Sequence, residues 1–221
     1  MAFERSLQAQ STSVLTTNKV IKNTYLLLSA TLLFSALMAG VSIVTAMPPS
    51  TYLFAVIGAM VLGMFVLPRT ANSGAGIGVI FLTTGLMGFG LGAILSLYLS
   101  LPRGPEIVSL ALGGTGVIFL GLSGYALTTR RDFSFLGGFL FVGVLVLLLA
   151  MLANLFMAIP ALSLALSAGI ILVMSGFILF DTSRIINGGE TNYILATFGL
   201  YLSIFNIFIS LLQILGVMSD D

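Results

Sequence analysis

The chain has no cysteine and no histidine. Without cysteine it has no thiol nucleophile, disulfide bond or thiolate metal site, and without histidine it has no imidazole base, haem ligand or histidine-type zinc site. Both lysines, Lys19 and Lys22, precede the first apolar stretch, which excludes a retinal Schiff base inside a helix bundle. We therefore predict that the protein is not an enzyme and that it has no catalytic residue, cofactor or metal.

Charged residues are also scarce. They make up 7% of the chain while hydrophobic residues make up 58%, and soluble domains carry roughly 25% charged residues. Such a composition cannot build a water-facing surface of normal size. The pair Arg130-Arg131 is the one cluster of cations in the sequence, so no surface is predicted to bind nucleic acid.

Seven stretches without a charged side chain fill most of the sequence. A helix needs roughly 20 apolar residues to cross a hydrocarbon core about 30 Å thick, and barrel strands would alternate polar and apolar residues instead. The predicted fold class is therefore an all-α membrane protein, a seven-transmembrane-helix bundle whose first partner is the lipid bilayer. The stretches are Tyr25–Ala46, Tyr52–Leu67, Ile77–Leu99, Ile107–Leu127, Phe135–Phe156, Ala161–Phe180 and Tyr193–Met218.

The cations predict the orientation of the bundle, because short cytoplasmic loops carry an excess of lysine and arginine. With seven spans, Arg103 alone falls on one side, and the other side receives Arg5, Lys19, Lys22, Arg69, Arg130, Arg131 and Arg184. This distribution predicts a cytoplasmic N-terminus and an extracytoplasmic C-terminus. Residues 1–24 are expected to form a polar cytoplasmic segment, followed by a transmembrane domain over residues 25–221 whose first span is a retained signal anchor.

Two sequence signals define the ends of the sixth helix. Pro160 is placed to begin it, and Asn187-Gly188-Gly189 to end it, because glycine accepts the left-handed geometry of a helix C-cap. The helix is then expected to run to about Ile186, which places Asp181 roughly one and a half turns inside its cytoplasmic end. Glu190 is expected to cap the next helix by placing its carboxylate near the first amides.

Many of the 25 glycines lie inside the predicted spans. In lipid, helices associate through close backbone contact, and small residues four apart provide a flat face for it. Gly74 and Gly78 form one such pair, and Gly88 and Gly92 form another. We expect tight helix packing at these four positions.

Polar residues inside the spans are candidates for function, because each costs free energy unless it is paired or hydrated. Asp181 and Arg184 are three positions apart, a spacing that allows an ion pair. A polar stripe is expected along the last helix, where Asp181 could face it and form a polar seam. The stripe consists of Ser203, Asn206, Ser210 and Gln213. The alternative is that Asp181 is an interfacial residue and that the stripe only makes interhelical hydrogen bonds.

Several sequence segments in these helices are similar to those of the Bax inhibitor-1 family of seven-helix membrane proteins. Phe180-Asp181-Thr182-Ser183-Arg184-Ile185-Ile186 and Leu200-Tyr201-Leu202-Ser203-Ile204-Phe205-Asn206 carry the resemblance. Gly188-Gly189-Glu190-Thr191-Asn192-Tyr193-Ile194 looks closest to the proteobacterial branch. That branch includes an inner-membrane protein that modulates the membrane-anchored, ATP-dependent protease FtsH. The resemblance thus implies a multi-pass protein of the bacterial inner membrane with FtsH as a partner.

The resemblance also implies a second possible role. In the wider family, two aspartates on the last two helices form a pH-sensing pair that gates a calcium leak. Asp181 matches the first aspartate, but the second falls on Ser203, which does not titrate. Arg184 and Asn206 would complete the latch or ion path, and the Ser203 hydroxyl could hydrogen-bond to Asp181.

Two functions of different class follow from the resemblance. The first is an interaction protein, a poorly degraded substrate or inhibitor of FtsH that is engaged through its N-terminal segment. The alternative is a calcium or cation leak around Asp181, with pH sensing weakened by Ser203. A third possibility is a bundle that stabilises other membrane assemblies. We favour the first.

Overall fold

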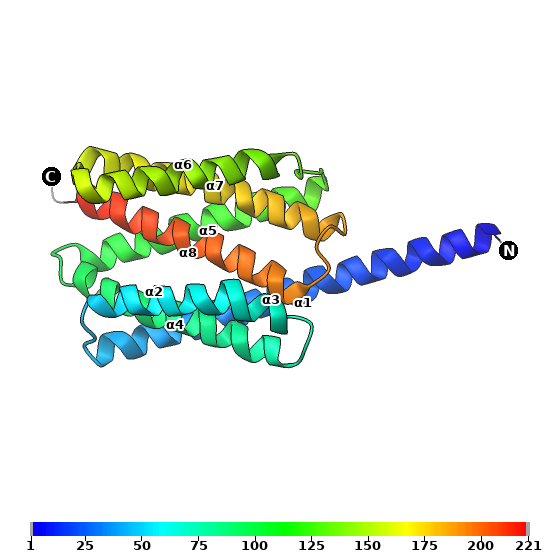
Figure 1. Ribbon diagram of the computed structural model, residues 1–221, viewed down its shortest axis with the longest axis horizontal. Coiled ribbons are helices and arrows are strands. Elements are labelled where there is room, and N and C mark those ends of the chain that lie inside the picture. Colours follow the sequence, from blue (N-terminus) through cyan, green and yellow to red (C-terminus); the bar gives the residue numbers. More distant parts are fainter. Residues whose placement is uncertain (1, 220–221) are drawn as a thin grey trace.

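The computed structural model describes the backbone of residues 2–219 and the side chains of residues 17–219. The described part of the chain contains seven helices that are long and apolar enough to cross a membrane, which confirms the predicted bundle. They pack side by side along one long axis (Figure 1). The elements are α1 (Ala2–Val44), α2 (Ser50–Val61), the π-helical turn η1 (Leu62–Val66), α3 (Leu67–Thr70), α4 (Ala75–Leu99), α5 (Gly104–Thr129), α6 (Leu136–Met157), α7 (Pro160–Ile186) and α8 (Tyr193–Met218).

Helix α1 is much longer than the apolar stretch that predicted it. Its backbone is helical from Ala2, and it passes residue 24 without a break. Its N-terminal half extends beyond the end of the bundle as a single helix (Figure 1). The polar segment proposed over residues 1–24 is therefore helical along its backbone from Ala2, although the side chains of residues 1–16 lie outside the described part.

The second span is not one continuous α-helix. Between α2 and α3 the chain forms the π-helical turn η1, and the Leu67 amide donates to the Leu62 carbonyl, five residues earlier. Pro68 follows at once. Its ring lacks an N–H and crowds the carbonyl four residues before it, so a wider turn here relieves the clash. The ring of Phe198 on α8 packs against Gly63 of this turn, where a side chain would overlap it.

Helix α8 lies at the centre of the bundle, and α6 lies at its edge. More than half of the most apolar part of α8 is buried, including the fully buried Leu200, Ile207 and Leu212. In α6, by contrast, Leu140 is the one residue classed as buried within the described helix, and α7 is its main neighbour. Helix α6 therefore presents most of its surface to lipid, whereas α8 depends on protein contacts along its length.

Glycines bring α1 and α4 into backbone contact. A Cβ atom at Gly88 would overlap the Ser35 carbonyl, and one at Gly92 would overlap the Ala39 carbonyl. On a second face of α4, Gly90 packs against Ala55 of α2, whose Cβ atom is 2.7 Å from the position of an ideal Cβ at Gly90. The pair at Gly74 and Gly78 behaves differently from our expectation, because a Cβ at either position would meet open space. Helix α4 thus packs through its second glycine pair and not its first.

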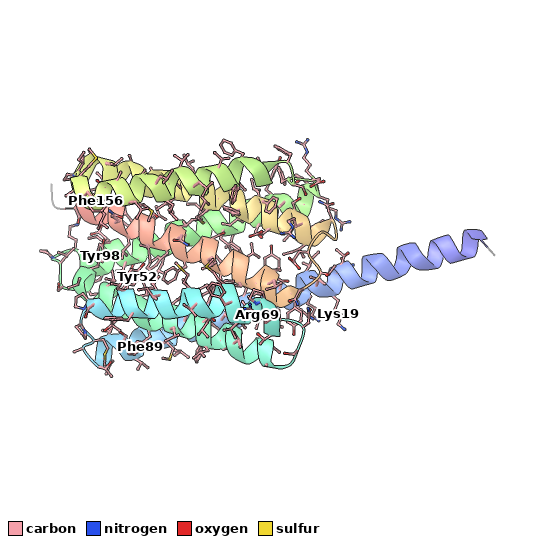
Figure 2. The ribbon with its side chains drawn as sticks, in the orientation of Figure 1. Lys19, Tyr52, Arg69, Phe89, Tyr98 and Phe156 are labelled. Carbon is pink, nitrogen blue, oxygen red and sulfur yellow. The ribbon has the colours of Figure 1, made fainter. Side chains whose placement is uncertain are left out.

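The two ends of the bundle differ in charge. The loops after α3, α5 and α7 lie at the end from which α1 projects, and Lys19 and Arg69 lie there as well (Figures 1 and 2). Arg130, Arg131 and Arg184 belong to the loops or helix termini of this same end. Arg103 begins α5 at the opposite end, where it makes a two-point ion pair with Glu106. We call the first of these the cationic end.

We expect Gly88→Ala to destabilise the bundle, because its methyl group must push the Ser35 backbone away. The free energy of unfolding should fall by about 1–3 kcal/mol, the usual cost of overpacking. Gly78→Ala on the same helix is the control, since its methyl group enters open space, and it should change stability by less than about 0.5 kcal/mol. Thermal unfolding of the purified proteins in detergent, followed by circular dichroism, measures both. Equal midpoints for the two variants would contradict this packing.

Candidate functional site

Asp181 lies in the interface between α7 and α8, near the cationic end. Its side chain is partly buried, and its Oδ2 atom is 2.8 Å from the position that a Cβ would take at Gly199 of α8. Glycine at position 199 therefore makes room for the carboxylate. Among the described residues, no side chain donates a hydrogen bond to Asp181, and no cation lies within ion-pair distance of it.

Arg184 pairs with Glu190, and the ion pair expected with Asp181 is absent. The Arg184 Nη2 atom is 3.6 Å from a Glu190 carboxylate oxygen and also donates to the Gly189 carbonyl at 3.2 Å. The chain reverses direction at Gly188, which has a φ of 75°. This reversal brings Glu190 back to the last turn of α7, so the loop provides a partner that helical spacing alone does not reveal.

Ser203 does not form the latch that we expected with Asp181. Its hydroxyl donates to the Gly199 carbonyl at 3.2 Å, one turn back on the same helix. Asp181 and Ser203 therefore both lie against Gly199 but do not hydrogen-bond to each other. The Ser203 hydroxyl thus donates to the backbone of α8 and not, as the family resemblance led us to expect, to the Asp181 carboxylate.

The rest of the polar stripe on α8 does not form a continuous seam. Asn206 donates to the Leu202 carbonyl of its own helix at 2.8 Å. Gln213 accepts a hydrogen bond from Ser167 of α7 at 2.8 Å, and Ser210 is buried. Of the four stripe residues, Gln213 is the one with a described hydrogen bond to another helix. The stripe thus makes hydrogen bonds within α8 and one hydrogen bond to α7, near the C-terminal end of α8.

Asn192, and not Glu190 as predicted, caps α8. The Asn192 side-chain oxygen accepts from the amides of Ile194 and Leu195, at 2.9 and 3.2 Å. Its amide group donates to Ala71 and Asn72 in the loop after α3. Glu190 instead accepts a bond from the Asn192 backbone amide. Asn192 therefore fixes the start of α8 and joins two loops at the cationic end. Its position just before the apolar run is a sequence signal for the capping role.

The third loop of the cationic end is held by Ser183. The Ser183 hydroxyl accepts from the Phe133 amide at 2.8 Å and donates to the Arg131 carbonyl at 3.2 Å. In the same loop, the Ser134 hydroxyl and backbone amide hold the pKa of Asp132 below its usual value. Asp132 is therefore an anion beside the Arg130-Arg131 pair, and the loop after α5 is fixed to α7. No pattern in the sequence marked Ser183 for this role.

Tyr201 makes a polar contact in the middle of the bundle that sequence reasoning missed. Its hydroxyl donates to the Thr84 carbonyl of α4 at 3.2 Å and lies 2.6 Å from the Ser35 hydroxyl of α1. The Tyr201 side chain is almost fully buried. A tyrosine in an apolar helix resembles any other core residue, so no pattern in the sequence marked it. The contact joins α8 to both helices of the α1–α4 pair.

No metal centre is found in the part of the chain that the structure describes. No three histidine, cysteine, aspartate or glutamate side chains come close enough there to hold a metal ion. The interactions described at the cationic end are ion pairs and hydrogen bonds, and the other described side chains leave the Asp181 carboxylate without a hydrogen bond.

Comparison with known proteins assigns a family to this architecture. Residues 17–220 match the family model described as inhibitor of apoptosis-promoting Bax1. The chain is 52% identical over 210 residues to "Modulator of FtsH protease YccA" of Escherichia coli K12, covering 95% of each protein. It is equally similar to "Inner membrane protein YccA" of another Escherichia coli strain. It is also 47% identical over 219 residues to an uncharacterized membrane protein of Vibrio cholerae, covering 99% of this chain and 97% of the relative.

We expect Asn192→Ala to loosen the start of α8. Removing a cap costs about 1–2 kcal/mol, so the amides of Ile194 and Leu195 should exchange with deuterium faster than in the unsubstituted protein. Asn192→Asp retains the accepting oxygen and loses the two donors to the loop after α3, so it should preserve most of this protection. Exchange measured by mass spectrometry distinguishes them, with Thr191→Ala, at an exposed position, as control. Equal exchange in the alanine and aspartate variants would show that the cap is not what protects the helix.

Proposed function

The chain belongs to the family of inhibitors of apoptosis-promoting Bax1, and from that premise we propose that it is an inner-membrane modulator of the protease FtsH. The observation that carries this proposal is the 52% identity, over 95% of both chains, to a protein named as such a modulator. Relatives also bear the name of inner-membrane protein, which agrees with seven membrane-spanning helices. The proposed role is that of a protein that FtsH engages but degrades poorly.

The position of α1 supports this mode of action. Its N-terminal half extends beyond the bundle at the cationic end (Figure 1), the end that cationic loops predict to be cytoplasmic. A protease that pulls on this segment would have to extract the rest of α1 from the bundle. There α1 contacts α4 through Gly88 and Gly92, and the Thr24 carbonyl accepts a hydrogen bond from Thr197 of α8. These contacts resist extraction and would keep the protease occupied.

We propose action by binding and not by catalysis. The names of the relatives given above describe a modulator and membrane proteins. The chain has no cysteine or histidine to serve as nucleophile or base. Its one partly buried carboxylate in a span, Asp181, lies against a glycine backbone, with no described nucleophile bonded to it. The proposed partners are therefore the lipid bilayer and the FtsH complex.

Deleting residues 2–12 should relieve any slowing of FtsH-dependent degradation. Overproduction of the full chain should lengthen the half-life of a known FtsH membrane substrate, because the protease is occupied, and the truncated chain should restore the normal half-life. Pulse-chase measurement of that substrate tests this in cells, with immunoblots to match the amounts of the two chains. A full chain with residues 2–12 replaced by a scrambled segment of the same composition controls for length. Unchanged turnover with the truncated chain would rule out engagement through the N-terminal segment.

A cation leak around Asp181 is the competing function. The observation in its favour is that the carboxylate lies between α7 and α8 without a described hydrogen-bond donor. Against it, the Ser203 hydroxyl bonds to Gly199, and Asp181 lines neither the cavity between α1 and α5 nor the one between α2 and α8. A leak through this interface would need α7 and α8 to separate.

Calcium flux distinguishes the two functions. We expect liposomes that hold the purified protein to admit calcium no faster than protein-free liposomes, as measured with an enclosed fluorescent indicator. Asp181→Asn keeps the shape of the side chain and removes its charge, so it should leave that rate unchanged. Rapid flux that Asp181→Asn abolishes would overturn the modulator proposal in favour of the leak.

A further inference from the structure

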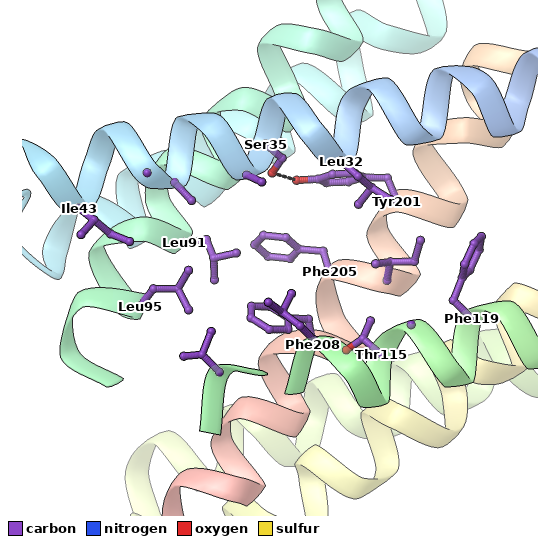
Figure 3. Close-up of a pocket in the computed structure, with 17 residues that line it drawn as sticks. Leu32, Ser35, Ile43, Leu91, Leu95, Thr115, Phe119, Tyr201, Phe205 and Phe208 are labelled. Atoms are coloured by element: carbon purple, nitrogen blue, oxygen red, sulfur yellow. Dashed lines mark hydrogen bonds between the residues drawn. The ribbon is translucent and has the colours of Figure 1, made fainter. Parts of the chain in front are cut away.

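A cavity of about 470 Å³ opens on the membrane-facing side of the bundle, between α1 and α5. Figure 3 shows α1 above it and α5 below it, with Leu91, Phe205 and Phe208 from α4 and α8 forming its floor. The floor residues are buried, each less than 10% exposed. At the rim, Leu112 is 58% exposed. The cavity is therefore a slot that lipid can reach from the side.

The lining of this slot suits hydrocarbon. None of its residues is charged. Its three hydroxyl groups are already bonded within the protein: Ser35 and Tyr201 to each other, and Thr115 to the Ala111 carbonyl. A charged or polar group of a ligand inside the slot would lose its hydrogen bonds to water without replacement, which is unfavourable. An uncharged apolar chain meets no such cost.

The slot has a closed end and a definite length. Toward the cationic end, Tyr25 of α1 hydrogen-bonds to Ser123 of α5, and its ring centroid lies 6.2 Å from that of Phe119. From there the lining runs along α1 from Leu32 to Ile43. Eleven helical steps cover about 16 Å, close to the half-thickness, about 15 Å, of a bilayer's hydrocarbon core. The slot thus spans one leaflet, on the side of Arg103.

We propose that this slot binds one acyl chain of a membrane phospholipid, taken from the leaflet on the Arg103 side. Its length matches the acyl layer of one leaflet, its chemistry is that of hydrocarbon, and its opening faces the lipid.

Two glycines give matched variants that fill the slot. A Cβ at Gly40 or at Gly116 meets nothing within 4 Å, and both residues line the slot. Gly116→Leu therefore adds a side chain where the acyl chain would lie, and its Cβ atom meets no protein atom within 4 Å. Gly113→Leu is the control on the same helix, because Gly113 also faces open space and is not part of the lining.

Fluorescence quenching tests the proposal directly. The chain has no tryptophan, so Phe205→Trp adds a single tryptophan at the buried floor, which can be excited at wavelengths where tyrosine does not absorb. In vesicles of phosphatidylcholine with brominated acyl chains, its emission should be at least halved relative to unbrominated vesicles. Adding Gly116→Leu should restore at least half of the lost emission, and adding Gly113→Leu should restore none. Emission that bromine leaves unchanged, or that Gly116→Leu fails to restore, would overturn the proposal.

A second measurement needs no substitution at the floor, in case Phe205→Trp does not fold. The unsubstituted protein is reconstituted with a phosphatidylcholine that carries a photoactivatable diazirine in its acyl chain, irradiated and digested. Mass spectrometry should find the buried Leu91 and Phe208 labelled, and Gly116→Leu or Gly40→Leu should reduce that labelling at least twofold while Gly113→Leu does not. Labelling confined to exposed side chains such as those of α6 would overturn the proposal.

Discussion

The fold depends on how α8 is fixed inside the bundle, because it packs against α1, α4, α5 and α7. In lipid there is no water to pair with a polar group, so each interhelical hydrogen bond fixes a position firmly. Hydrogen bonds hold α8 at four depths, and one of them joins the Thr197 hydroxyl to the Thr24 carbonyl of α1. Asn192 fixes its start to the loop after α3, Tyr201 fixes its middle to α1 and α4, and Gln213 fixes its last turns to α7. Between these contacts, Gly199 lets α7 approach closely enough for Asp181 to fit.

The same contacts give a physical basis to the proposed modulation of a protease. Helix α1 carries the projecting segment, and it is bound to α8 through Thr24 and Ser35 and to α4 through backbone contact at Gly88. Pulling on the segment would not unwind an isolated helix. It would have to separate α1 from two neighbours at once and break the hydrogen bond between the Ser35 and Tyr201 hydroxyls. A bundle tied in this way can be engaged and still resist unfolding.

The sequence predicted the spans well and their contacts less well. Long apolar runs fix the number of spanning helices, and Pro160 and Gly188 mark the ends of α7, because these signals are local. Spacing along one helix, in contrast, cannot show which face meets a neighbour. Gly88 contacts α1 whereas Gly78 faces open space, although both belong to pairs with the same spacing. Likewise, spacing along α7 cannot show that Arg184 pairs with Glu190, because Glu190 lies beyond the chain reversal at Gly188. The sequence analysis did not predict the π-helical turn before Pro68, and only the structure shows that Phe198 packs against it.

Helix α1 takes part both in the proposed engagement by FtsH and in the proposed binding of an acyl chain. One side of this helix is held by α4 through direct backbone contact, and the other side faces the slot that separates it from α5. The described hydrogen bond between α1 and α5, which joins the Tyr25 and Ser123 hydroxyls, lies at the closed end of the slot. With an acyl chain in the slot, lipid supplies the packing that protein lacks there, because dispersion contacts are lost wherever a surface has no neighbouring atoms. The resistance of α1 to extraction then depends on the surrounding lipid as well as on the glycines of α4.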